Sequence, residues 1–134
     1  MPVNSLDHIN IITSQLDATC DYYTQLLGLE RRNPPIELPP EAVQWLYDGQ
    51  DRALFHITTP QFRNIYPVPG PAVSPTGAIN HIALDCSDFA DTIARLEAMG
   101  AEYSTNGIDS VRLKQIFTSD PNQVLLELNF RGER

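Results

Sequence analysis

Two pairs of metal-binding side-chain types recur at nearly the same spacing along this chain. His8 and His81 each stand third in a short apolar segment that comes immediately before a helix-like stretch. His56 and Glu127 each lie between apolar neighbours near the end of the same half of the chain. His81 follows His8 by 73 residues, and Glu127 follows His56 by 71. This repeat in near register predicts a duplicated scaffold that brings the four side chains to one point.

The size and charge of the chain narrow the classes of protein it can belong to. With 134 residues, 42% of them apolar, it suits one globular domain, which we expect over residues 4–131. A formal net charge of −8 and a single lysine, Lys114, do not suit a surface for nucleic acid or anionic membranes. No apolar stretch approaches the roughly 20 residues of a membrane-spanning helix, and residues 1–4 lack signal-peptide features. We therefore expect a cytoplasmic protein in which Cys20 and Cys86, far apart and outside any CxxC spacing, are free thiols.

The first half of the chain predicts a strand, a helix and three further strands. Residues 5–13 alternate and are rich in β-branched side chains, as is typical of a strand. Ser14 and Asp17 resemble a helix-opening cap, and apolar residues then recur at helical spacing up to Gly28, which predicts a helix over 15–27. Further strands are expected at 29–33, 42–47 and 52–59, the last two joined by a glycine-containing turn at 48–51.

The second half repeats this order after a linker. Residues 60–77 hold five prolines and two glycines and show neither helical nor strand periodicity, so we expect a linker without regular structure. A strand at 78–86 precedes a helix that Asp88 and Asp91 open and Gly100 ends. The remaining strands are expected at 101–104, 112–118 and 123–130, with a turn at 120–122.

These elements predict an α+β fold made of two βαβββ repeats, over about 5–59 and 78–130. Because side chains alternate along a strand, Leu126 and Leu128 share one face of the last strand, and Glu127 lies on the other. The same alternation places the three histidines on the less apolar face of their strands. We predict a curved, cup-shaped mixed sheet with the candidate ligands on its inner face and the helices on its outer face.

The order of elements resembles the glyoxalase, bleomycin-resistance and extradiol dioxygenase superfamily, also called vicinal oxygen chelate proteins. The resemblance covers about residues 5–130, and the segments that carry it most clearly are 6–9, 22–29, 80–84 and 118–128. It implies a cup-shaped sheet with a divalent metal ion at its floor, often in a homodimer. It also implies that the ligands come from the first and fourth strands of each half, which here gives His8, His56, His81 and Glu127.

Imidazole and carboxylate ligands suit Fe²⁺, Zn²⁺, Ni²⁺ or Mn²⁺, and two histidines with one carboxylate leave positions open for oxygen activation at non-haem iron. A small-molecule substrate with two neighbouring oxygens can occupy such open positions. Fe²⁺ is expected for a ring-cleaving dioxygenase, and Zn²⁺, Ni²⁺ or Mn²⁺ for a lyase or isomerase that uses Glu127 or His56 for proton transfer. Glyoxalase I proteins typically have glutamate where this chain has His56, and this difference argues against lactoylglutathione chemistry. His56 is either a metal ligand or a residue that lines the pocket or acts as acid or base.

Other side chains are candidates for the substrate pocket. We expect Gln115 to hydrogen-bond a substrate oxygen and Trp45 and Tyr47 to form an aromatic wall or part of the core. Asn10 and Asn129 lie two residues from His8 and Glu127 on the same faces, where they either orient the ligands or fill the cup. The alternative to a metal-dependent enzyme is a protein that binds and sequesters a small molecule without turnover, as bleomycin-resistance relatives do.

Overall fold

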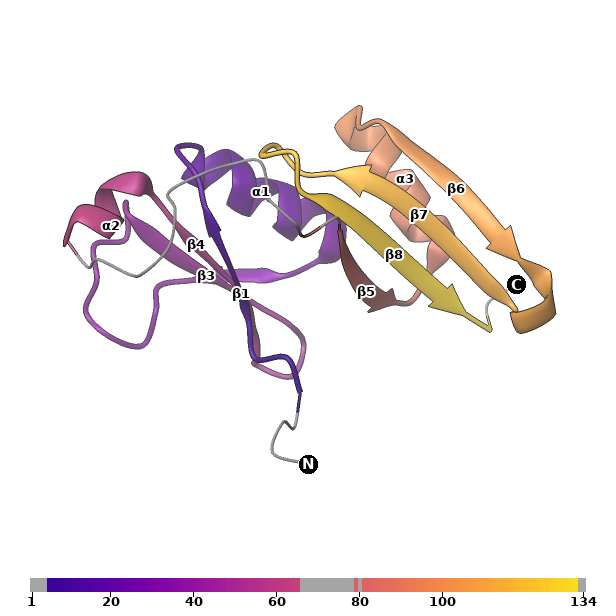
Figure 1. Ribbon diagram of the computed structural model, residues 1–134, viewed down its shortest axis with the longest axis horizontal. Helices are drawn as coiled ribbons and strands as arrows, with labels where there is room; N and C mark the ends of the chain where they lie inside the picture. The colour runs from indigo at the N-terminus through magenta and orange to yellow at the C-terminus, as the bar shows by residue number, and fades with distance from the viewer. Residues whose placement is uncertain (1–4, 66–78, 80, 133–134) are drawn as a thin grey trace. The chain divides into compact units, whose positions relative to one another are not determined.

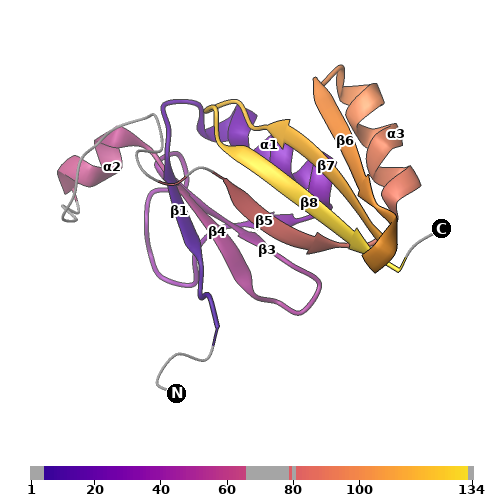
Figure 2. The same ribbon diagram turned by 45° about the vertical axis from the view of Figure 1, so that its right-hand side comes forward.

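The eight strands in the described part of the chain form two four-stranded sheets with the same connectivity. The structure, a computed structural model, describes residues 5–65, 79 and 81–132. The chain divides into two compact units, Met1–Val73 and Ser74–Arg134. The strand order is β1-β4-β3-β2 in the first unit and β5-β8-β7-β6 in the second (Figures 1 and 2). The predicted α+β fold of two βαβββ repeats is confirmed.

In the first unit, β1 runs parallel to β4, and β4 runs antiparallel to β3. The elements are β1 (Ile9–Ile12), α1 (Leu16–Leu27), β2 (Glu30–Arg32), β3 (Val43–Tyr47), β4 (Ala53–Thr58) and α2 (Pro60–Ile65). The core lies between α1 and the sheet, where Tyr23, Phe55 and Ile57 are at most 1% exposed. The rings of Tyr23 and Phe55 stack with centroids 4.6 Å apart, a contact worth about 0.5–1.5 kcal/mol beyond the burial of area.

The ends of α1 show one difference from the sequence prediction. Gly28 ends the helix as predicted, with φ at 69° and its N–H donating to the carbonyl of Thr24. Ser14, however, is not the cap: Gln15 holds the N-cap position and its side chain makes no capping hydrogen bond. The hydroxyl of Thr13 accepts the N–H of Gln15 at 2.8 Å. The helix begins at Leu16, one residue later than predicted.

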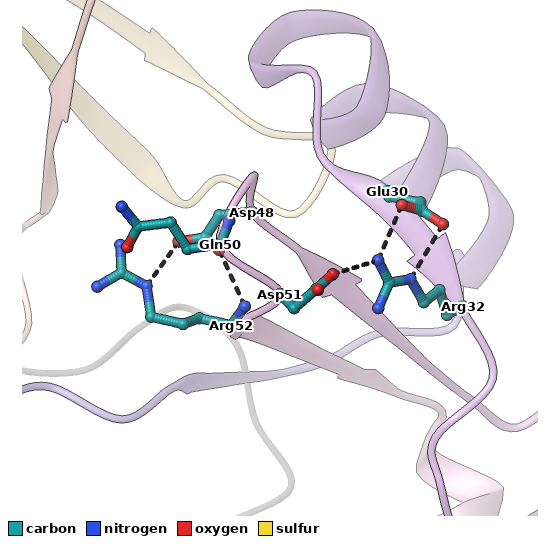
Figure 3. Close-up of polar contacts among 6 residues, drawn as sticks. All are labelled: Glu30, Arg32, Asp48, Gln50, Asp51 and Arg52. Carbon is teal, nitrogen blue, oxygen red and sulfur yellow. Dashed lines mark hydrogen bonds and ion pairs between the residues drawn. The ribbon is translucent and has the colours of Figure 1, made fainter.

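An aspartate rather than a glycine shapes the turn between β3 and β4 (Figure 3). The carboxylate of Asp48 accepts the backbone N–H groups of Gln50 and Arg52, both at 2.9 Å, and these hydrogen bonds lower the pKa of Asp48. The left-handed conformation falls on Asp51, with φ at 59°, and Gly49 is outside that region. The predicted turn is present, but an Asx-type hydrogen-bond pattern forms it.

The expectation that residues 60–77 lack regular structure is wrong for the first six of them. Pro60–Ile65 form the short helix α2. Proline suits the first position of a helix, where its missing N–H has no intrahelical partner, and the hydroxyl of Thr59 accepts the N–H of Phe62 at 3.3 Å. Thr59 and Pro60 therefore start a helix. The sequence prediction was wrong here because it counted every proline of the stretch as evidence against regular structure. The rest of the predicted linker lies outside the described residues.

The second unit repeats the connectivity of the first. Its elements are β5 (Ile82–Cys86), α3 (Phe89–Met99), β6 (Tyr103–Ile108), a 3₁₀ turn (Asp109–Val111), β7 (Leu113–Ser119) and β8 (Leu125–Arg131). Asp88 caps α3 by accepting the N–H of Asp91 at 3.1 Å, and Gly100 ends the helix with φ at 65°, both as predicted. Strand β6 extends four residues beyond the predicted 101–104, because all six of its residues pair with β7 although Asn106 and Gly107 have low strand propensity.

The two faces of β8 differ as the alternation predicted. Leu126, Leu128 and Phe130 are fully buried, whereas Leu125 and Glu127 are partly exposed. Helix α3 covers one face of this sheet (Figure 2). On the buried face of β8, the ring of Phe89 from α3 meets the ring of Phe130 edge-on, with centroids 5.3 Å apart. Within the described residues, no helix is long and apolar enough to cross a membrane.

Candidate functional site

The first pair of candidate ligands meets on the open face of the first sheet. His8 immediately precedes β1, and the parallel register of β1 and β4 places Asn10 opposite His56. The ring of His8 therefore lies over the ring of His56, with centroids 3.7 Å apart and planes 12° apart. We predicted that both histidines lie on the less apolar face of their strands. On that shared face of the sheet their rings are in contact.

His56 is also in contact with an aromatic ring from β3. Trp45 lies directly opposite His56 in the antiparallel pair, and their rings stack with centroids 3.8 Å apart and planes 5° apart. Burial, and then the positive charge of His8, lower the pKa of His56 to about 4. His56 is therefore a neutral imidazole at pH 7, and the edge of its ring carries a lone pair that can bind a metal or accept a proton.

An aspartate sets which ring nitrogen of His8 carries hydrogen. Nδ1 of His8 lies 2.6 Å from the carboxylate of Asp7. An ionised carboxylate only accepts hydrogen bonds, so Nδ1 is the donor, and in the neutral ring the lone pair is then on Nε2. A histidine that donates one N–H to a carboxylate while its other nitrogen binds a metal is a common arrangement in metal sites.

The other predicted pocket residues of this unit lie beside the pair but do not bond to its rings. Asn10 donates to the backbone carbonyl of His56 at 3.1 Å, so it ties β1 to β4 and does not orient a ligand ring. The ring of Tyr47 lies 6.4 Å from the ring of Trp45. The guanidinium carbon of Arg32 lies 4.2 Å from the centroid of the Tyr47 ring. The same guanidinium forms ion pairs with Glu30 and Asp51 (Figure 3).

The second pair of candidate ligands lies on the open face of the second sheet. His81 immediately precedes β5, and the parallel register of β5 and β8 places Ala83 opposite Glu127. Nε2 of His81 is 3.6 Å from Oε1 of Glu127, which is too far for a good hydrogen bond. Two ligand atoms bound at about 2.1 Å from one ion are roughly 3.0–3.6 Å apart, so this separation suits joint ligation of a metal.

Hydrogen bonds hold the carboxylate of Glu127 from its other side. Asn129 donates to Oε2 of Glu127 at 2.9 Å, the orienting contact that its position two residues away had suggested. The side chain of Gln115 donates to Oδ1 of Asn129 at 3.0 Å. Asn106, which no sequence pattern indicated, donates to Oε1 of Gln115 at 2.8 Å. Only the pairing of β6 with β7 shows this contact, because no spacing along the chain relates Asn106 to Glu127.

The donor chemistry of both pairs fits a divalent transition metal. His56 is neutral, His8 presents Nε2, and Glu127 adds a carboxylate, which together suit Fe²⁺, Zn²⁺, Ni²⁺ or Mn²⁺. Among residues 5–65, 79 and 81–132, no group of three or more His, Cys, Asp or Glu side chains forms a potential metal site. The candidates form one pair in each unit.

Comparison with known proteins identifies the family. The family model of the Glyoxalase/Bleomycin resistance protein/Dioxygenase superfamily matches residues 5–128. A curated relative, Glyoxylase I 4 from Arabidopsis thaliana, is 23% identical over 128 residues, which are 94% of this chain and 70% of that protein.

Solved structures show the same fold. Lactoylglutathione lyase from Agrobacterium tumefaciens is 18% identical with a TM-score of 0.70, over 97% of this chain and 96% of that one. A point mutant of the fosfomycin resistance protein FosX from Listeria monocytogenes is 18% identical with a TM-score of 0.68, over 96% and 93% of the two chains. The match to the family model over nearly the whole sequence shows that this chain belongs to the Glyoxalase/Bleomycin resistance protein/Dioxygenase superfamily.

Proposed function

We propose that this protein is a divalent-metal-dependent enzyme acting on a small molecule that binds the metal through two neighbouring oxygens. The ion would be held by His8, His56, His81 and Glu127. The observation that carries the proposal is the pair formed by His81 and Glu127, whose ligand atoms are 3.6 Å apart while Asn129 fixes the opposite carboxylate oxygen. The FosX structure that shares this fold contains Mn(II) and a dihydroxypropylphosphonic acid, a ligand with two neighbouring hydroxyls.

The bound ion would polarise the oxygens of the substrate and stabilise the negative charge that develops on them. The chain itself supplies two groups for proton transfer. Glu127 has one carboxylate oxygen that faces His81, and a carboxylate that binds a metal keeps further lone pairs for a proton. His56 is neutral at pH 7 because its pKa is lowered to about 4, and since its ring has a single lone pair, it serves in proton transfer only where His8, His81 and Glu127 alone hold the ion. Trp45 and His8 cover the two faces of the His56 ring, so only its edge reaches a reacting atom.

Two reaction types use this set of ligands, and the metal separates them. A lyase or isomerase needs Zn²⁺, Ni²⁺ or Mn²⁺ and moves a proton between neighbouring carbons, whereas a ring-cleaving dioxygenase needs Fe²⁺ and O₂. We favour the proton-transfer type, because His56 is held rigidly and uncharged at the site. The lactoylglutathione lyase that shares this fold supports this choice. We further propose that the active form is a homodimer.

The proposal is tested by loading the metal-free protein with each ion and assaying three substrate classes. We expect turnover of a glutathione hemithioacetal or an acyl-CoA epimer with Zn²⁺, Ni²⁺ or Mn²⁺, and its loss in His81→Ala. Oxygen uptake with a catechol after anaerobic loading with Fe²⁺ would instead support the dioxygenase reaction. Protein that takes up none of these ions would overturn the proposed function, and sedimentation of a monomer at working concentration would overturn the dimer.

A further inference from the structure

We propose that Gln115 is a positioning residue that acts through Asn129 to fix the carboxylate of Glu127, and that Asn106 completes this amide chain. The inference rests on the proposed metal function and assigns Gln115 a role other than contact with substrate. The amide chain is Asn106, Gln115 and Asn129, one residue from each of β6, β7 and β8.

The sheet register places the three amides side by side. Asn106 is directly opposite Gln115 in the pairing of β6 with β7, and Gln115 is directly opposite Asn129 in the pairing of β7 with β8. Asn129 and Glu127 are two residues apart on one strand and therefore share a face. The hydrogen bonds along this row measure 2.8, 3.0 and 2.9 Å.

The charge of Glu127 fixes the direction of every hydrogen bond in the amide chain. A carboxylate only accepts, so Asn129 must turn its NH₂ group toward Glu127 and its oxygen toward Gln115. Gln115 must then present its own NH₂ group to Asn129, which leaves its oxygen for the NH₂ group of Asn106. Each amide is thus held in one of its two possible orientations by its neighbour.

Burial makes this orientation consequential at Asn129. Asn129 is only 6% exposed, whereas Gln115 is partly exposed and Asn106 is exposed. A buried amide that loses a partner rotates to recover it, because an unsatisfied buried polar group is costly. Without Gln115, the oxygen of Asn129 loses its donor and only the hydrogen bond to Glu127 still holds the amide. The amide then shifts toward another donor, and Oε1 of Glu127 is no longer fixed at 3.6 Å from His81.

The test measures the dissociation constant for Mn(II), from the electron paramagnetic resonance signal of the free ion, in variants of the full chain. Gln115→Met keeps the length of the side chain and removes both hydrogen bonds, and we expect affinity to fall about tenfold, within the range seen when an outer partner of a metal ligand is removed. Gln50→Met is the matched control, because Gln50 is exposed in the turn between β3 and β4 (Figure 3). Its affinity should equal that of the wild type.

Gln115→Glu separates positioning from charge. A carboxylate at this position can only accept, so it competes with Glu127 for the NH₂ group of Asn129 and turns the amide chain around. Added negative charge alone would tighten Mn(II) binding, whereas loss of positioning weakens it. We expect weaker binding, and tighter binding would overturn the inference.

A double-mutant cycle tests whether Gln115 acts through Asn129. Asn129→Ala should weaken Mn(II) binding by about 10- to 100-fold, and Gln115→Met in that background should add no further loss. Independent, multiplicative losses would contradict the inference. Thermal unfolding of each metal-free variant checks folding, and if Asn129→Ala does not fold, Gln115→Met and Gln115→Glu still decide the question. Wild-type protein that binds none of Mn(II), Zn²⁺, Ni²⁺ and Fe²⁺ would refute the proposed function and the inference together, whereas binding that Gln115→Met leaves unchanged refutes the inference alone.

Discussion

The ring of His56 stacks on the ring of His8, with the two ring centroids 3.7 Å apart. The ring of Trp45 stacks on the other face of His56, with centroids 3.8 Å apart. This contact between His8 and His56 follows from the parallel register of β1 and β4, which aligns the side chains of the two strands on the open face of the sheet. The stack holds an imidazole that is uncharged at pH 7. It also places the only tryptophan of the chain, Trp45, where its fluorescence reports the charge of His56.

The fluorescence of Trp45 should therefore follow the protonation of His56 in the metal-free protein. Burial and the charge of His8 lower the pKa of His56 to about 4, and a protonated imidazole in a stack quenches tryptophan emission. We expect quenching with a midpoint near pH 4, absent in His56→Gln. The unfolded chain binds this proton near pH 6.5, so the contribution of His56 to stability is complete above that pH and is lost as the pH falls toward 4. A midpoint near 6.5 would contradict the account.

The two faces of β8 should respond differently to the same substitution. Leu126 is fully buried against the side of the sheet that α3 covers, so Leu126→Ala should lower the free energy of unfolding by about 2–5 kcal/mol. Leu125, its neighbour on the open face, is only partly buried, and Leu125→Ala should cost less than about 1.5 kcal/mol. Urea denaturation of both variants measures the difference. Equal losses would show that the assignment of faces is wrong.

This division of faces was predictable because it depends only on the alternation of side chains along a strand. The same is true of the helix ends at Gly28 and Gly100, where only glycine adopts the left-handed conformation at low cost. The fold and the placement of the two histidines of the first unit on one face followed from such local rules. These rules need no knowledge of which strands pair.

Features that depend on strand pairing or on a single hydrogen bond could not be predicted in this way. The six residues of β6 pair with β7 although Asn106 and Gly107 disfavour strands, because the ladder stabilises them. This register places Asn106 opposite Gln115, and only that pairing reveals its hydrogen bond to the candidate site. The helix at Pro60–Ile65 begins after Thr59, whose hydroxyl and backbone carbonyl both accept the N–H of Phe62, in a stretch where the prolines argued against regular structure.

Cys20 should be unreactive in the folded protein. It is fully buried, and burial raises the pKa of its thiol to about 11. Because the thiolate is the reactive form, Cys20 should not react with a disulfide reagent at pH 8 until the protein unfolds. Reaction of wild-type protein and of Cys20→Ala with the reagent, with and without urea, gives the number of thiols that react. A thiol that is lost from the folded protein on the Cys20→Ala substitution would contradict the prediction.

Asp7 should affect metal binding although its own side chain is 93% exposed. Asp7→Asn removes the carboxylate that accepts the N–H of His8 at Nδ1, so Nε2 loses its preference as the ring nitrogen with the lone pair. Because the aspartate is exposed, we expect a loss near the lower end of the 10- to 100-fold range of such partners, about tenfold in the dissociation constant for Zn²⁺. Calorimetric titration with Zn²⁺ measures it, and Asp51→Asn is the control. Unchanged affinity in Asp7→Asn would show that Asp7 does not orient His8.

The central proposal is that His8, His56, His81 and Glu127 hold a single divalent ion. The most direct measurement is the metal content of protein purified without chelators, for the wild type, His8→Ala and His81→Ala. We predict about one divalent ion per chain in the wild type and almost none in either variant, because removal of one ligand weakens the whole site. Two ions per chain, or a variant that keeps half of its metal, would show that the pairs bind separately and would contradict the account.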